Sequence, residues 1–187
     1  MKTRQLTYNA LIIAIIAVMA FVPGLGLLTF GAVSITILHV PVIIAALLLG
    51  GKSAIIASIA FGVSTMLVAM TRGVTPIDAL FVNPVVSVLP RFMFGVVLAG
   101  LVTLFSKFKI RNTFSDVIVA VLGTGAHTVL VLTILFFFLG FEGDFLTQLS
   151  SWWTLIVGIL IANTSLEILA AIMLGIPVVT ILRRQIR

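Results

Sequence analysis

The stretch Pro84–Phe105, PVVSVLPRFMFGVVLAGLVTLF, contains one charged residue, Arg91, among mostly apolar neighbours. An α-helix needs roughly 20 predominantly apolar residues to cross the hydrocarbon core of a bilayer. A guanidinium stays ionised near neutral pH, and an ionised group at membrane depth is costly unless it is paired, solvated or functional. The stretch therefore predicts a membrane-spanning helix and makes Arg91 a candidate functional residue.

The composition of the whole chain supports a membrane protein. Of its 187 residues, 61% are hydrophobic and 9% are charged, whereas soluble domains have about 25% charged residues. So few charges cannot cover a surface that faces water. The two histidines and five acidic residues argue against a metal centre or an acid–base enzyme, and the absence of cysteine excludes disulfides and thiolate ligands. We expect no catalytic residues, no metal site and no bound cofactor.

Six apolar runs have roughly the length of membrane-spanning helices, and they lack the alternating pattern of barrel strands. Proline and glycine end the first run, and two glycines end the second. The runs are approximately Leu6–Val22, Ile35–Leu49, Ser53–Met70, Pro84–Phe105, Asp116–Leu139 and Trp152–Leu182. They predict an all-α integral membrane protein with six transmembrane helices in a single domain over residues 1–187.

The basic residues predict the orientation in the membrane. All but two of the 11 lysines and arginines fall at the termini or in alternate loops, the exceptions being Arg72 and Arg91. The remaining loops carry Asp78, Glu142 and Asp144. Because basic segments stay on the cytoplasmic side, both termini are expected in the cytoplasm. The net charge of +6 is thus explained by the membrane and not by nucleic acid.

Polar side chains within the spans usually face the bundle interior or a wet cavity. Most of those in this chain fall in the predicted outer half, which suggests a small-molecule pocket that opens outward. The candidate substrate-binding residues are His39, Asn83, Arg91, His127, Asn163 and Glu167, with Trp152 as a stacking aromatic side chain.

Each candidate also has a structural interpretation. Glu167 is the acid expected within a span, so it is the predicted partner of Arg91 in the empty site, and the pair could simply lock two helices together. His127 and Asn163 could make hydrogen bonds between helices. His39, which precedes Pro41 closely, could cap a kink.

The first run carries a different signal. Its sequence NALIIAIIAVMA places Ala10, Ala14 and Ala17 on one face of a helix. Small side chains at this spacing let another helix approach closely. This face therefore serves either internal packing or docking of another membrane protein.

Two stretches resemble a known family. VSITILHVPVIIAALLLGGKSAIIASIAFGVST (Val33–Thr65) and FVNPVVSVLPRFMFGVVLAGLV (Phe81–Val102) are similar to the substrate-binding S components of energy-coupling factor (ECF) vitamin transporters. The six spans and the alanine-stepped first helix fit the same family. The resemblance covers most of the chain and is weakest over Phe141–Ser151. Pantothenate-type members are the most similar, with hydroxymethylpyrimidine-type members close behind.

The resemblance implies a mechanism. An S component of the cell membrane captures its vitamin on the outer side and docks on a transmembrane T component coupled to two ABC-type ATPases. It is thought to topple in the membrane to release its cargo inside. Ala10, Ala14 and Ala17 would then contact the T component. The chain has no Walker A loop, so ATP would be used by the partner subunits.

The sequence is compatible with two kinds of ligand, a carboxylate-bearing vitamin and a neutral pyrimidine. Arg91 suits the carboxylate of pantothenate, because its planar fork can bond both oxygens. A neutral pyrimidine, or another B vitamin of that kind, would favour Asn163, Glu167 and stacking on Trp152.

An autonomous secondary transporter would be expected to show repeat symmetry or paired broken helices. A membrane enzyme using His127 and Glu167 as acid and base would lack a further catalytic partner.

Overall fold

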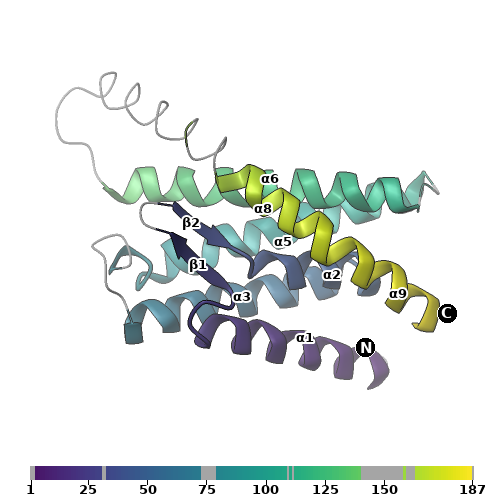
Figure 1. Ribbon diagram of the computed structural model, residues 1–187, viewed down its shortest axis with the longest axis horizontal. Coiled ribbons are helices and arrows are strands. Elements are labelled where there is room, and N and C mark those ends of the chain that lie inside the picture. The colour runs from purple at the N-terminus through teal and green to yellow at the C-terminus, as the bar shows by residue number, and fades with distance from the viewer. Residues whose placement is uncertain are drawn as a thin grey trace.

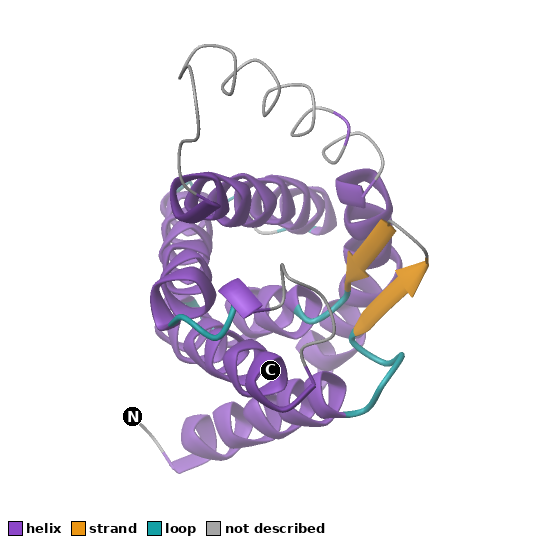
Figure 2. Ribbon diagram, turned by 90° about the vertical axis from the view of Figure 1, so that its left-hand side faces the viewer, coloured by secondary structure: helices purple, strands orange, loops and turns teal. Residues whose placement is uncertain are grey.

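Helices make up most of the computed structural model, which describes residues 3–30, 33–72, 79–108, 110, 112–139, 158 and 163–186. They run side by side about a common axis (Figures 1 and 2). Two short strands lie between the first two helices. The elements are α1 (Thr3–Phe21), β1 (Leu27–Phe30), β2 (Val33–Thr36), α2 (His39–Leu49), α3 (Gly51–Arg72), α5 (Pro84–Lys107), α6 (Thr113–Leu139), α8 (Ser165–Ala170), the π-helical η2 (Ala171–Gly175) and α9 (Ile176–Ile186).

The helices confirm the predicted all-α membrane architecture. Within the described residues, five helices are long and apolar enough to cross a bilayer: α1, α3, α5, α6 and the continuous last helix from Ser165 to Arg184. The sixth predicted span corresponds to α2, which has 11 residues. At 1.5 Å per residue, α2 rises roughly 16 Å, about half the thickness of the hydrocarbon core.

The hairpin β1–β2 corrects the predicted second span, which was expected to begin at Ile35. Ile35 and Thr36 instead lie in β2, which pairs antiparallel with β1, with Leu27 opposite Thr36 and Phe30 opposite Val33. The Ile37 N–H then donates to the Gly26 carbonyl at 2.8 Å. Figure 1 shows the hairpin towards the end of the bundle away from the chain termini. The short helix α2 is therefore continued along the bundle by a hairpin and not by more helix.

Both chain termini lie at the other end of the bundle (Figure 1). Basic residues gather there: Lys107 ends α5, and Arg183 and Arg184 lie in the last turn of α9. This agrees with the charge distribution expected of a cytoplasmic end. The cytoplasmic location of the termini stays a prediction.

Small residues bring α3 and α5 into close contact. A methyl group at Gly62 would come within 2.9 Å of the Val88 Cα atom, and one at Gly51 within 2.8 Å of the Ala99 Cβ atom. Glycine at such positions lets two membrane helices approach closely. At Gly62 the neighbouring atoms include the Arg91 Cβ atom, at 3.3 Å. This contact brings Phe61 on α3 close to Arg91 on α5.

The last helix contains a wide turn that the sequence did not predict. Between Glu167 and Arg183, a regular α-helix would rotate by about 160° beyond whole turns. The π-helical turn η2 takes up about one extra residue and reduces this rotation to roughly 60°. Consequently both side chains reach partners inside the bundle, Glu167 at the hairpin and Arg183 at α6.

Candidate functional site

A buried polar cluster occupies the core where the hairpin, α2, α5, α6 and α8 meet. Polar groups inside a membrane protein are costly and usually functional, so this cluster is the candidate site. Each of its seven side chains is at most 8% exposed. They are His39, Arg91, Thr124, His127, Thr128, Thr164 and Glu167.

Arg91 is held by a local irregularity in α5. Pro90 has no N–H, so the Val86 carbonyl cannot accept its usual helical hydrogen bond. The Arg91 guanidinium donates to this carbonyl instead, at 3.0 Å. Its central carbon also lies over two aromatic rings, 5.5 Å from the centroid of Phe61 and 5.0 Å from that of Phe81.

Among the described residues, Arg91 also has an unsatisfied buried donor. Its Nε atom is buried and makes no hydrogen bond within the described part of the chain. Buried donors are nearly always satisfied in proteins, so an unpartnered one asks for an explanation. A bound acceptor, such as a carboxylate oxygen, is one explanation.

Three aromatic rings surround that of His127. Its ring stacks on His39 (centroids 5.8 Å apart, planes at 17°) and on Phe61 (5.4 Å, 27°). Phe94 meets it edge-on at 5.1 Å and 66°. Both ring nitrogens of His127, and Nε2 of His39, are buried without a hydrogen bond to any described residue. The group therefore presents several unused hydrogen-bonding atoms in a buried, aromatic environment.

Glu167 joins the hairpin to the last helix. Its carboxylate accepts the Thr36 N–H at 2.8 Å and the Thr128 hydroxyl at 3.5 Å. Thr164 in turn donates to the Thr128 hydroxyl at 3.2 Å. The Thr36 bond satisfies a backbone group of non-helical chain, as is required inside a membrane protein.

The predicted ion pair between Arg91 and Glu167 is not formed in the structure. Across the residues that the structure describes, the ion pair is that of Arg183 with Asp116, and Arg91 and Glu167 do not pair directly. The physical reason is that each has another partner: Glu167 the hairpin backbone, and Arg91 the carbonyl freed by Pro90. The Arg91 charge is thus left without a bound carboxylate.

The family model described as the ECF transporter, substrate-specific component, matches residues 4–179. The chain belongs to this family. None of the curated proteins compared with the chain matches it. The family is that of a transporter component and not an enzyme family, so the polar cluster is considered below as a candidate binding site.

The other predicted ligand residues of the S component lie apart from the cluster or outside the described chain. Asn83 is exposed and caps α5, where its side chain accepts the Val85 N–H at 2.9 Å. Asn163 is half-buried just before α8 and lies on the same helix as Glu167. Trp152 lies outside the described residues. The structure thus brings together His39, Arg91, His127 and Glu167 from the predicted set.

The alanine face of the S component is turned outward on α1. The buried residues of this helix are Asn9, Ile16 and Ala20. Ala10 and Ala14 are exposed, and Ala17 is half-buried. At the first two positions the small side chains do not serve packing within the bundle.

Sequence reasoning missed the aromatic members of the site. Phe61, Phe81 and Phe94 stand among many other apolar residues of their spans, and no local pattern distinguishes a ring that faces a histidine from one that faces lipid. Pro90 was a usable signal, because it frees the carbonyl that Arg91 binds. Thr164 has no such local feature that would have marked it as a member of the site.

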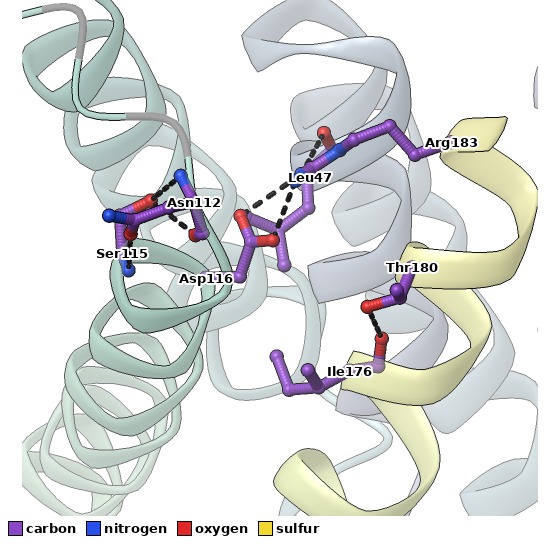
Figure 3. A network of polar contacts seen from close by, with 7 residues as sticks. All are labelled: Leu47, Asn112, Ser115, Asp116, Ile176, Thr180 and Arg183. Atoms are coloured by element: carbon purple, nitrogen blue, oxygen red, sulfur yellow. Dashed lines mark hydrogen bonds and ion pairs between the residues drawn. The ribbon is translucent and has the colours of Figure 1, made fainter.

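A second polar network lies at the end of the bundle that carries the termini (Figure 3). Arg183 binds both carboxylate oxygens of Asp116, at 2.8 and 3.0 Å, and reaches the Leu47 carbonyl at 3.5 Å. Asn112 and Ser115 form a capping ring beside it at the start of α6.

A cavity of about 400 Å³ opens at this same end and is lined by Asp116, Lys107 and Arg183 among others. None of the predicted substrate residues of the S component lines it. Its buried carboxylate is already bound by an arginine, whereas the atoms around His127 are unused. The buried cluster is therefore the better candidate for the substrate site.

Proposed function

We propose that this S component binds a small water-soluble vitamin that carries a carboxylate, with pantothenate favoured, and presents it for ATP-driven uptake across the cell membrane. The observation that carries this proposal is Arg91. It is 5% exposed, its Nε atom is unpartnered within the described chain, and it has no direct ion pair with Glu167.

A buried positive charge with no directly bound carboxylate favours an anionic cargo. Removing a guanidinium from water costs several kcal/mol unless an opposite charge and good hydrogen bonds offset it. The rings of Phe61 and Phe81 offset part of this cost. A ligand carboxylate offsets more, because it accepts two parallel bonds from the planar fork.

Hydroxymethylpyrimidine is the second candidate. The stacked rings of His39, His127 and Phe61 are a favourable surface for a flat heterocycle, and Glu167 supplies an acceptor. A neutral pyrimidine would nevertheless leave Arg91 without a directly bound carboxylate. For this reason the carboxylate-bearing vitamin is preferred.

The substrate proposal is tested by equilibrium binding to the purified chain in detergent or nanodiscs. Isothermal titration calorimetry with a panel of B vitamins should give saturable binding of pantothenate. Hydroxymethylpyrimidine should compete weakly or not at all. Tight binding of hydroxymethylpyrimidine with no response to pantothenate would reject the anionic cargo while leaving the transport role intact.

The partners proposed are a transmembrane T component and two ABC-type ATPase subunits, which supply the energy. The exposed alanines of α1 support docking on the T component, since small side chains let helices of two membrane proteins meet closely. No cofactor is proposed for the S component itself. Capture is proposed to occur at the hairpin end of the bundle, and the charge distribution supports an extracellular location for this end.

Bulk on the alanine face should separate binding from transport. Ala14→Trp is expected to leave vitamin binding by the isolated chain within about twofold, because the side chain is exposed on α1. It should reduce ATP-dependent uptake and co-purification of the ATPases by at least tenfold. The matched control is Ile15→Trp, which puts the same bulk at a residue that is 43% exposed, about 100° around the helix from Ala14. Equal transport by both variants would remove the alanine face from the interface.

A further inference from the structure

We infer, building on the function proposed above, that His39 binds a hydroxyl group of the ligand, at the opposite end of an aromatic row from Arg91. The site would then select a specific class of cargo. This class is a small acid that also carries a hydrogen-bond donor several bonds from its carboxylate.

The tautomer of His39 follows from its partner. Its Nδ1 atom lies 2.7 Å from the Thr36 carbonyl oxygen. A carbonyl can only accept, so Nδ1 carries the hydrogen and donates it. In a neutral ring the other nitrogen, Nε2, is then an acceptor. A second buried cation close to Arg91 would add another uncompensated charge to the core, so the neutral ring is favoured.

This acceptor is unused. His39 is completely buried, and Nε2 has no hydrogen-bond partner among the described residues. The backbone N–H of Thr36 is not free to donate to it, because that N–H is bound to Glu167. The group that satisfies Nε2 must therefore be a donor that comes from outside the described core, such as a ligand O–H or N–H.

The two ends of the site are joined by stacked rings. Arg91 lies over Phe61 at 5.5 Å, Phe61 stacks on His127 at 5.4 Å, and His127 stacks on His39 at 5.8 Å. The row thus places a cationic donor at one end and a neutral acceptor at the other, with two rings between them. A ligand lying along it would direct its carboxylate to Arg91 and its hydroxyl to His39.

His127 offers a further hydrogen-bond donor and a further acceptor beside His39. A neutral imidazole has one donor and one acceptor, and both nitrogens of His127 lack partners in the described chain. A hydroxyl or amide group can donate to one histidine while it accepts from the other. An alkyl group at the same place would leave these atoms buried and unsatisfied.

The test compares pantothenate with an analogue in which both hydroxyls are replaced by hydrogen and the carboxylate is kept. Leaving a buried hydrogen-bonding group unpaired weakens binding by roughly 5- to 150-fold. The wild-type chain in nanodiscs should show a loss of this size for the analogue, measured as the ratio of the two Kd values. Equal Kd values for the two ligands overturn the inference but leave the anionic cargo standing.

Two substitutions of His39 locate the effect. His39→Asn places an amide donor near the position of Nδ1, so the bond to the Thr36 carbonyl can persist, but no acceptor remains at the position of Nε2. The analogue penalty should fall to within about twofold in this variant. His39→Gln places an amide oxygen near Nε2 and should keep a penalty of several-fold. An undiminished penalty in His39→Asn would assign the hydroxyl to another residue and overturn the inference.

The outcomes separate the two proposals. If the wild-type chain binds neither pantothenate nor its analogue, the proposed anionic cargo fails and the inference falls with it. If both ligands bind but the penalty does not depend on His39, only the inference fails. Thermal unfolding and size-exclusion chromatography of each variant identify any variant that has lost its fold. If a variant has lost its fold, the ratio of the two Kd values of the wild-type chain decides.

Discussion

Replacing Arg91 by alanine is expected to weaken pantothenate binding by about 2–5 kcal/mol, a reduction of roughly 30- to 5000-fold in affinity. The physical reason is that the ligand carboxylate would be buried without its cation. Arg91→Lys should also bind poorly, because an ammonium is a point charge and cannot reproduce the paired bonds of a planar fork. The measurement is the Kd of each purified variant by calorimetry.

A control variant is needed for the loss of one positive charge from the chain. Arg4→Ala removes one positive charge from an exposed position in the first turns of α1 and should leave the Kd unchanged within about twofold. Pantothenate binding by a folded Arg91→Ala variant at the wild-type affinity would mean that Arg91 is structural. The anionic cargo would then lose the observation that supports it.

The companion substitution Glu167→Gln distinguishes the two interpretations of Arg91. If Arg91 and Glu167 acted as one ion pair, neutralising Glu167 should restore folding to Arg91→Ala. We expect no such rescue, because the two side chains do not pair directly in the described structure. Glu167→Gln should instead weaken the attachment of the hairpin at Thr36.

The second large effect is expected at the opposite end of the bundle. Arg183→Ala should lower the free energy of unfolding by about 3 kcal/mol, because it leaves the carboxylate of Asp116 buried and uncompensated. The Asp116 side chain is 3% exposed and that of Arg183 is 21% exposed, which places the expected effect at the low end of the range for buried pairs. Figure 3 shows the arginine fork facing this carboxylate.

Thermal or denaturant unfolding of the detergent-solubilised chain measures this effect. The matched control is Arg184→Ala, which removes the same charge from the exposed neighbouring residue and should change stability by less than about 0.5 kcal/mol. Adding Asp116→Asn to Arg183→Ala should recover part of the loss, since no buried charge then remains unpaired. Equal unfolding of the Arg183 and Arg184 variants would show that the ion pair contributes nothing measurable.

The positions of the membrane spans could be predicted well because hydropathy is a local property. The stretch from Pro84 to Phe105 is long and apolar enough to span, and α5 covers it with two further residues at its end. The second span was different. Ile35 and Thr36 are as compatible with the end of an apolar helix as with a strand, and the choice depends on pairing with β1.

The candidate site could be predicted only as a set of costly residues. An arginine, two histidines and a glutamate in apolar runs stand out because each must be compensated inside a membrane. Which group compensates which could not be predicted, and the expected pair of Arg91 with Glu167 was wrong. The prediction for Trp152 falls outside the described residues.

The sequence by itself determined that the protein lies in a lipid bilayer, that its fold is helical, and which buried polar residues need a partner. These properties follow from composition and from spacing along single segments. The tertiary structure alone decided the partners. Thr36 and Glu167 are 131 residues apart, and Asp116 and Arg183 are 67 apart. Their bonds depend on helix packing and on the turn η2, which rotates both Glu167 and Arg183 inward. A local pattern cannot encode these contacts, because each depends on where two distant segments come to lie together.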